Sequence, residues 1–295
     1  MGTYNIRNNG NNGDVERGNG WNQRLSVICD QVNFEQPDIF GTQEVLIGQV
    51  HDLENGLPGY AHIGVGRDDG KEGGEHECIW YNTNRLELLD KGDFWLNETP
   101  DKPALGWDAA CIRICSWGKF TTITKTKKSN KSLPIGGNGE GTFFFFNLHM
   151  DHVGVVARRE AAKLVVKKIK EIAGTAPVVL TGDFNVDQKD EIYKIFTESG
   201  ILKDSYVATK QRFAQNGTFN SFDTNLFTDS RIDHIFVSPS TTVNHYAVMT
   251  NGYWTEISPE EKELKGHDAP QEISFKRYQQ RAASDHYPVW AKITL

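Results

Sequence analysis

Short runs of apolar and β-branched residues recur along the whole chain, and this pattern constrains the fold more than any other feature. Most of these runs have the length of β-strands, whereas only residues 21–34 and 157–172 form long segments with apolar residues at helical spacing. In the second segment, Ala161, Val165 and Ile169 share one face of the helix. Strands that outnumber helices predict an α/β fold of two packed, mostly antiparallel sheets with helices on their outer faces.

The expected strands cover residues 3–7, 38–43, 75–81, 86–96, 109–124, 142–149, 177–180, 232–238, 243–250 and 287–294. Residues 191–198 are expected to form a short helix, and the Asn- and Gly-rich residues 8–20 a flexible loop. No repeat with a period of about 20–50 residues and no Pro- or Ser-rich linker divides the chain. We therefore expect a single domain spanning residues 1–295, which is long enough to fold without a disulfide or a structural metal.

The chain is acidic, with 32 basic against 39 acidic side chains and a net charge of −7. Sequence-independent binding along a phosphate polymer depends on many Lys and Arg contacts, so this charge disfavours a nuclease that wraps long nucleic acid. The basic residues 125–131 are expected to form a solvated turn. Cys29, Cys78, Cys111 and Cys115 lack a Cys-x-x-Cys spacing and are expected to be unpaired, buried residues.

Features that would indicate a membrane or a protein partner are sparse. No apolar run approaches the ~18 residues of a transmembrane helix, and no segment indicates an obligate protein partner. The location stays open between the cytoplasm and export after removal of a signal segment. Trp95, Trp107, Trp117 and Trp254 are expected in the core, because tryptophans on strands are most often buried.

Polar residues follow several apolar runs at the point where each predicted strand ends. These residues are Asn5, Glu44, His149, Asp183, Asn185, Asp233, Asp285 and His286. Carboxylate and amide oxygens placed at the rim of a sheet can hold a hard divalent cation. A histidine beside an acid can transfer a proton near neutral pH. The sequence therefore predicts a polar site at the strand ends.

The order of these blocks along the chain is more specific than any single block. Thr3-Tyr4-Asn5-Ile6-Arg7 precedes Gln43-Glu44, Asn147-Leu148-His149, Gly182-Asp183-Phe184-Asn185, Ile232-Asp233 and Ser284-Asp285-His286. In this order the blocks resemble those of the endonuclease/exonuclease/phosphatase family, which includes deoxyribonuclease I, neutral sphingomyelinases and mRNA deadenylases. The resemblance covers nearly the whole chain. It implies a four-layer α/β-sandwich and Mg²⁺- or Mn²⁺-dependent cleavage of a phosphoester.

The resemblance also implies where a metal would be held. Glu44 is expected to be the main ligand, with Asp285 near the metal. Asn5 is expected to lie beside the metal or the phosphate. A cation at this position would neutralise charge on the phosphate during the reaction.

A second group of residues is implied to carry the proton transfers and to hold the phosphate. Asp183 would orient or deprotonate the attacking water, and Asn185 would hold that water or a phosphate oxygen. His149 would donate to a non-bridging oxygen, and His286 would pair with Asp233. Such a set of donors around a reacting phosphate lowers the barrier by electrostatic stabilisation.

One position departs from part of the family. Base-excision members carry an acid two residues after the first Asn, where this chain has Arg7. The block from Asn147 onward, with Arg158 beyond it, instead resembles the branch of deadenylase-like and sphingomyelinase-like enzymes. Arg113 and Arg158 are candidates for binding the substrate phosphate. The His-x-His-x-Asp-His zinc motif of metallo-β-lactamase-type hydrolases is a poor match, because Asn147 stands where its first histidine is needed.

Three functions stay open at this point. The first is a metal-dependent phosphodiesterase that acts on nucleic acid or nucleotides. The second is a hydrolase of a small phosphorylated metabolite or a phospholipid head group, although no apolar hairpin with paired aromatics is evident for a sphingomyelinase. The third is a catalytically inactive relative used for binding, which the complete set of polar blocks disfavours. The substrate is therefore undecided between nucleic acid and a small molecule.

Overall fold

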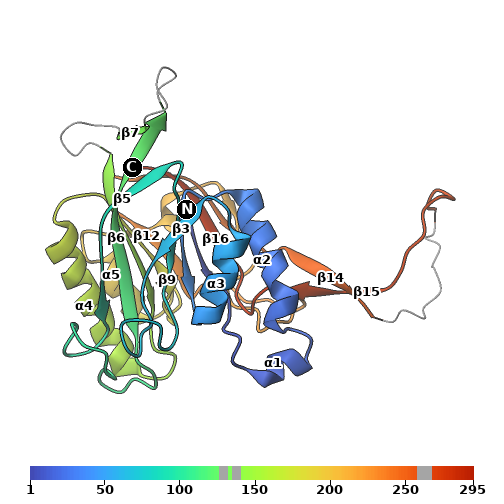
Figure 1. The fold of residues 1–295 in the computed structure, drawn as a ribbon, viewed down its shortest axis with the longest axis horizontal. Coiled ribbons are helices and arrows are strands. Elements are labelled where there is room, and N and C mark those ends of the chain that lie inside the picture. Colours follow the sequence, from blue (N-terminus) through green and yellow to red (C-terminus); the bar gives the residue numbers. More distant parts are fainter. Residues whose placement is uncertain (126–131, 135–140, 258–267) are drawn as a thin grey trace.

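Two β-sheets pack face to face at the centre of the molecule, and helices cover their outer faces (Figure 1). The computed structural model describes residues 1–125, 132–134, 141–257 and 268–295. The first sheet has the strand order β11 (Arg212–Phe213), β13 (Thr242–Val248), β16 (Val289–Thr294), β1 (Gly2–Asn5), β2 (Ile39–Gln43), β4 (Ile79–Asn82), β3 (Tyr60–Ile63). The second has the order β10 (Lys203–Asp204), β12 (Asp233–Val237), β9 (Val178–Asp183), β8 (Thr142–His149), β6 (Ile114–Lys125), β5 (Leu86–Trp95), with β7 (Ser132–Pro134) paired to β6.

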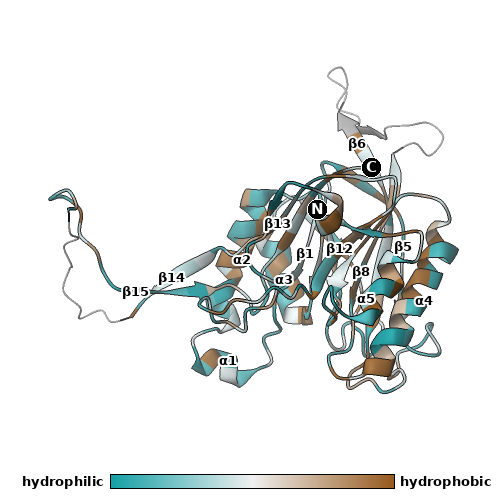
Figure 2. Ribbon diagram, turned by 180° about the vertical axis from the view of Figure 1, so that it is seen from behind, coloured by the Kyte–Doolittle hydropathy of each residue, from teal (hydrophilic) through white to brown (hydrophobic). Residues whose placement is uncertain are grey.

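The helices form the two outer layers. On one side, α2 (Trp21–Glu35) and α3 (Ile47–Gly56) pack on the first sheet, and on the other α4 (Val155–Ala173) and α5 (Glu191–Thr197) pack on the second. Two shorter helices, α1 (Asn12–Glu16) and α6 (Ser205–Ala208), lie in connecting segments. The helices show apolar and polar stripes, as expected where one face is buried (Figure 2). The predicted four-layer α/β-sandwich with mostly antiparallel sheets is confirmed.

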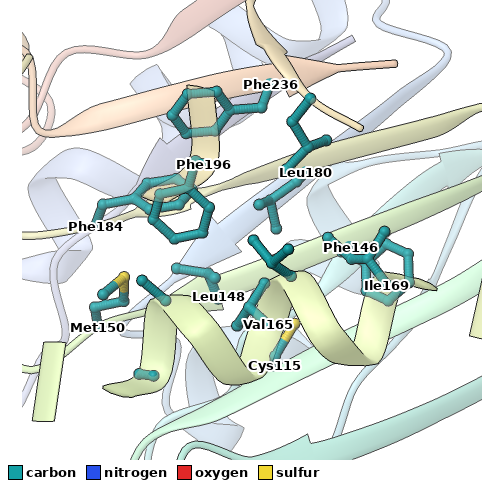
Figure 3. Packing of buried hydrophobic residues seen from close by; sticks show 14 of the residues in the cluster. Cys115, Phe146, Leu148, Met150, Val165, Ile169, Leu180, Phe184, Phe196 and Phe236 are labelled. Atoms are coloured by element: carbon teal, nitrogen blue, oxygen red, sulfur yellow. The ribbon is translucent and has the colours of Figure 1, made fainter. Parts of the chain in front are cut away.

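The Phe143–Phe146 run shows why a strand in this position is apolar throughout. Side chains alternate between the two faces of a strand. Phe143 and Phe145 belong to the core between the two sheets, whereas Phe144 and Phe146 belong to the core beneath α4. Figure 3 shows Phe146 beside Ile169 of that helix. A strand covered on both faces therefore needs no polar position.

The two sheets are also joined by buried polar contacts close to one end of the sandwich. Gln43 of β2 donates to Asn147 of β8 at 2.6 Å, and Asn147 donates to the carbonyl of Thr42 at 2.9 Å. Gly41 permits this approach, since a Cβ at that position would lie 2.1 Å from the Asn147 side-chain oxygen. These contacts set the spacing of the sheets where the polar strand ends gather.

Several elements differ from the expectations. Residues 8–20 are not all loop, because Asn11 caps α1 by accepting from the Gly13 amide. Helix α3 was not predicted. A third, two-stranded sheet of β14 (Gly252–Glu256) and β15 (Tyr278–Ala282) projects from the body of the molecule (Figure 1). This hairpin was not predicted; it is largely polar, and none of its cross-strand pairs joins two aromatic residues.

The remaining expectations concern single residues and segments. Trp95 is buried and Trp107 and Trp117 pack against the core, but Trp254 on the hairpin is 62% exposed, against the prediction. All four cysteines are free, and Cys111 alone among them is only partly buried. Of the basic residues 125–131, 126–131 lie outside the described residues. In the described part of the chain, none of the helices is both long and apolar enough to span a bilayer.

Candidate active site

The pairing of the strands brings the predicted polar residues to one end of the sandwich. Strands β1 and β2 run parallel, as do β8 and β9, so the carboxyl ends of each pair lie side by side. Strand β12 runs antiparallel to β9 and begins where β9 ends, which sets Asp233 opposite Asp183. The segment that enters β16 likewise lies beside the end of β1, because these strands are antiparallel. The six blocks of polar sequence therefore meet at one end of the sandwich.

His286 and Asp233 form a buried ion pair at this rim. The Nδ1 atom of His286 lies 2.9 Å from Oδ2 of Asp233, and both residues are buried. The Nε2 atom of the same ring faces Oδ2 of Asp183 at 3.6 Å. Burial alone would lower the pKa of His286, but the negative charges of Asp233 and Asp183 outweigh it and raise the pKa well above its ordinary value. His286 is therefore a cationic hydrogen-bond donor at neutral pH.

Asp183 is held in a position suited to a base. Its Oδ2 accepts from the Asn5 amide at 3.0 Å, and its Oδ1 accepts from the backbone N–H of Asn185 at 2.9 Å. Burial and the neighbouring Asp233 raise the pKa of Asp183 to about 7, although His286 opposes them. A carboxylate with this pKa can take a proton from water near neutral pH.

Asn185 and His149 lie next to Asp183 on the cavity floor. The Asn185 amide donates to the Met150 carbonyl at 2.9 Å and lies 3.2 Å from Nε2 of His149. Burial, and then the positive charge of Arg113, lower the pKa of His149 well below its ordinary value. His149 is therefore neutral at physiological pH and can act as a neutral donor or acceptor toward a phosphate.

Glu44 and Asp285 form an acidic pair that faces the cavity. One guanidinium nitrogen of Arg7 lies 3.8 Å from Glu44 Oε2 and 3.5 Å from Asp285 Oδ2. Burial raises the pKa of Asp285, and the negative charge of Glu44 adds to this effect. The positive charge of His286 opposes it. Two buried carboxylates that face one cavity offer hard oxygen donors, which fits a divalent metal ion.

Asn5 lies between two carboxylates of the site, and its expected place beside the metal or the phosphate stays a prediction. Its amide nitrogen donates to Glu44 Oε1 and to Asp183 Oδ2, each at 3.0 Å, while its oxygen accepts from the backbone N–H of Arg7. Both ends of the amide are therefore engaged by protein groups. These contacts make Asn5 a positioning residue that orients the two carboxylates.

The two candidate arginines are placed differently. Arg113 lines the cavity, 3.1 Å from His152 Nδ1 and 3.5 Å from the Asp151 carboxylate. Arg158 lies on α4 and donates to the Asp151 carbonyl at 2.9 Å, outside the cavity. The Arg158 side chain is engaged by the segment that precedes α4, which does not support its predicted contact with a phosphate; the role of Arg158 stays a prediction.

Two acids near His149 were not found from the sequence. Oxygens of Glu75 and Glu77 each lie 4.0 Å from Nδ1 of His149, and Arg67 is paired with Glu75. Burial raises the pKa of Glu77 well above its ordinary value, with Glu75 adding to the effect. Glu75 and Glu77 flank His76, so in an extended segment both carboxylates lie on the same face. This spacing could have identified them as candidate site residues.

The residues described above line one cavity of about 1260 Å³. Its floor holds Glu44, Asp183 and Asp285, and one wall is formed by the β14–β15 hairpin. Arg7, Glu44 and Asn185 have positive φ angles of 59°, 62° and 49°. Non-glycine residues in this conformation are uncommon, and such strain gathers at functional sites. The geometry therefore supports a catalytic rather than a purely structural role for this cavity.

Comparison with known proteins extends the likeness over the whole chain. Residues 2–286 match the Endonuclease/Exonuclease/phosphatase family. A mannosyl-6-phosphatase of Bacteroides thetaiotaomicron shares 46% identity, with coverage of 100% of this chain and 98% of that chain and a TM-score of 0.84. An endonuclease/exonuclease/phosphatase of Bacteroides vulgatus shares 36% identity, with 100% and 97% coverage and a TM-score of 0.78. An uncharacterized protein of Acanthamoeba polyphaga mimivirus is 26% identical over 237 residues, which are 73% of this chain and 79% of that protein.

Proposed function

Because this chain belongs to the endonuclease/exonuclease/phosphatase family of phosphoester hydrolases, we propose that it is a divalent-metal-dependent phosphatase that removes phosphate from a sugar. The observation that carries the proposal is the meeting of an acidic pair, Glu44 and Asp285, with the Asp183–His286–Asp233 group on one cavity floor. Residues 1–295 would act as one catalytic domain. The sugar is suggested by the 46% identity to a mannosyl-6-phosphatase over the whole chain.

The residues on the floor suit hydrolysis by direct attack of water. Asp183 accepts a proton from the attacking water, the water oxygen bonds to phosphorus, and the bond from phosphorus to the sugar oxygen breaks. The products are inorganic phosphate and a sugar hydroxyl, whose proton comes from solvent. His286 donates to a phosphoryl oxygen as charge builds on it, and Asp233 fixes the ring for that contact.

The phosphate is held by neutral and cationic donors around the floor. Asn185 and His149 lie beside Asp183, and Arg113 lines the same cavity. Glu44 and Asp285 would hold Mg²⁺ or Mn²⁺, which would supply Lewis-acid stabilisation of the phosphate charge. Asn5 donates to both Glu44 and Asp183 and so fixes the positions of the two carboxylates relative to each other.

Nucleic acid is the less favoured substrate. The net charge is −7, and the arginines Arg7, Arg17 and Arg67 that line the cavity are already paired with its carboxylates. A polyanionic strand needs many cationic contacts to its phosphates, whereas a sugar phosphate carries a single phosphate group. The first of the functions left open by the sequence, a phosphodiesterase, is therefore ranked below the second.

The test is release of inorganic phosphate from a panel of substrates. Mannose 6-phosphate, glucose 6-phosphate, a nucleoside monophosphate and bis(4-nitrophenyl) phosphate would be compared with Mg²⁺, with Mn²⁺ and with EDTA. We expect metal-dependent turnover of the hexose 6-phosphates and none of the diester. Faster cleavage of the diester, or turnover that EDTA does not reduce, would contradict the proposal. Glu87→Gln, on the exposed face of β5, is the control for a change of charge alone.

A further inference from the structure

We propose that the β14–β15 hairpin is a carbohydrate-binding platform, so that the substrate carries its phosphate on an oligosaccharide or glycoside rather than on a free sugar. This inference rests on the proposed sugar phosphatase function and adds the substrate class. Trp254, Tyr278 and Gln280 of the hairpin line the same cavity as the catalytic floor. A ligand that fills this cavity therefore contacts both the catalytic residues and the hairpin.

Trp254 differs from the other tryptophans of the chain. Trp21, Trp80, Trp95 and Trp290 are at most 9% exposed, and Trp107 and Trp117 pack against the core. Trp254 is 62% exposed on a hairpin that projects from the body (Figure 1). A large aromatic side chain left open in a cavity wall is typical of a binding surface.

The register of the hairpin places aromatic and amide groups together. Trp254 is paired with Gln280, and Glu256 is paired with Tyr278. Side chains directly opposite each other, and those two residues apart on one strand, share a face. Trp254, Gln280 and Tyr278 therefore lie on one face. Aromatic rings bind the C–H face of a pyranose, and neighbouring amides bind its hydroxyls, so this combination suits a sugar ring.

The platform is held in place before any ligand binds. Arg281 of β15 donates to the Arg17 carbonyl at 2.9 Å, to Asn19 at 3.0 Å and to Thr255 of β14 at 3.0 Å. These contacts join both strands of the hairpin to the segment that follows α1. A platform fixed in this way loses little conformational freedom on binding, which favours affinity.

The cavity also presents a second fixed wall. Phe222 has a φ of 60°, its N–H donates to the Asn220 side chain at 2.8 Å, and the Arg24 guanidinium lies 5.4 Å from its ring centre. Phe222 lines the cavity together with the polar residues Asp223, Thr224 and Asn225. The total cavity volume of about 1260 Å³ exceeds the range of about 300–1,000 Å³ usual for small-ligand sites. The space therefore fits more than one sugar ring.

A nucleobase is the rival occupant, because bases also stack on aromatic rings. Asp14 is neutralised by Arg7 at 2.9 Å and Arg17 at 2.6 Å, but the carboxylate of Asp223 lines the cavity of a chain with a net charge of −7, and both disfavour the phosphates that link successive bases. A glycan has hydroxyls in place of those phosphates, and carboxylates accept hydrogen bonds from hydroxyls. The net charge of the chain and the carboxylate of Asp223 thus favour a glycan.

The test compares substrates of three sizes in wild type, Trp254→Ala and Trp254→Phe. The substrates are glycerol phosphate, mannose 6-phosphate and a mannobiose that carries the 6-phosphate. For the disaccharide, we expect Trp254→Ala to raise KM about tenfold with kcat unchanged, and Trp254→Phe to restore most of the loss. Glycerol phosphate should be unaffected. Phe34→Ala on α2, where the ring is 86% exposed, is the matched control and should change nothing.

A second measurement separates this inference from the proposed function. Calorimetry with phosphate-free mannobiose reports binding to the platform without turnover. Binding that Trp254→Ala weakens supports the platform even if the enzyme hydrolyses no phosphomonoester, in which case only the proposed function fails. Equal effects of Trp254→Ala on all three substrates, no effect on the disaccharide, or no mannobiose binding would overturn the inference. If Trp254→Ala weakened the binding of a single-stranded oligonucleotide but not of mannobiose, the inference would also be overturned, and the hairpin would be a surface that binds bases.

Discussion

His286 and Asp233 belong to different sheets, yet their side chains meet at 2.9 Å across the end of the sandwich. Asp233 begins β12 of the second sheet, and His286 lies just before β16 of the first. The pair is buried, so neither charge is compensated by solvent and each depends on the other. The ion pair therefore couples the chemistry of the site to the docking of the sheets.

Removal of either member of this pair should reduce the chemical step. A positioned proton donor contributes roughly 10²–10⁴-fold to rate, so His286→Ala and Asp233→Asn should each lower kcat by about that factor. The double variant should lose little more, because the two residues act as a unit. Measurement of kcat and Tm separates this from a structural role, which predicts a lower Tm with nearly normal turnover. Turnover within about tenfold of wild type for His286→Ala would refute the catalytic role.

Glu44 should control both metal binding and activity. Loss of a residue that only orients a metal ligand typically costs about 10–100-fold, so loss of a direct carboxylate ligand should cost more than about 100-fold. Titration of Mg²⁺ or Mn²⁺ by calorimetry, together with phosphate release, measures both effects for Glu44→Ala. Glu87→Gln is again the control. Unchanged affinity and activity in Glu44→Ala would mean that the metal lies elsewhere.

The rate should depend on pH through Asp183. As the base, Asp183 must be deprotonated, and its pKa of about 7 means that kcat/KM should fall as the pH drops below that value. His286 must be protonated, and its raised pKa keeps it protonated above pH 7. We therefore expect kcat/KM to stay constant above pH 7 until the pKa of His286 is reached. A pH profile of kcat/KM checks both limbs. A profile without an acid limb would exclude Asp183 as the base.

Asp151 should contribute to stability in a defined pH range. Its carboxylate accepts from the backbone N–H groups of Ala110, Cys111, Val153 and Gly154. Burial acts against ionisation, but these hydrogen bonds lower the pKa of Asp151 to about 2 from an ordinary value of 3.8. The stabilisation is therefore complete above pH 3.8 and is lost as the pH falls through about 2.

Asp151→Asn should consequently lower the free energy of unfolding by about 2 kcal/mol at neutral pH. The difference from wild type should shrink in acid, where the wild-type carboxylate becomes protonated. Urea unfolding at several pH values measures this difference. Asp30→Asn, at an exposed position of α2, is the control. A difference that is independent of pH would contradict the role of the charge.

Binding to long duplex DNA should be weak at physiological salt. The acidic surface offers few cationic contacts to phosphates, so the slope of log K against log salt should be shallower than about −5. Fluorescence anisotropy at several salt concentrations measures the slope. Tight binding with a steeper slope would place the nuclease function ahead of the sugar phosphatase.

The predictable part of the molecule consists of elements whose residues are covered on both faces. Such strands, for example Phe143–Phe146, are apolar throughout and are visible in the sequence. The β14–β15 hairpin was missed because both its strands are largely solvent-exposed and so lack an apolar alternation. Helix α3 buries Gln49, Val50 and Leu53, and two apolar positions are too few for a clear periodic signal.

The positions of the site residues were predictable where they depend on the ends of strands. Asp183, His286 and Glu44 stand at strand ends, and strand ends of neighbouring strands meet, so their proximity could be predicted. The roles of Arg158 and Asn5 depend on side-chain direction, which the position in the chain does not fix. Glu75 reaches His149 from a segment that precedes β4, and this proximity is a tertiary contact that local sequence does not encode.

The close approach of Gly41 to Asn147 has a consequence for how the protein would lose activity. The first sheet supplies Asn5, Glu44 and His286, and the second supplies His149, Asp183 and Asp233. Neither sheet holds a complete catalytic set. Any heat, denaturant or bulky substitution at Gly41 that loosens the contact between the sheets would separate the two halves while each kept its secondary structure. Inactivation would therefore precede unfolding.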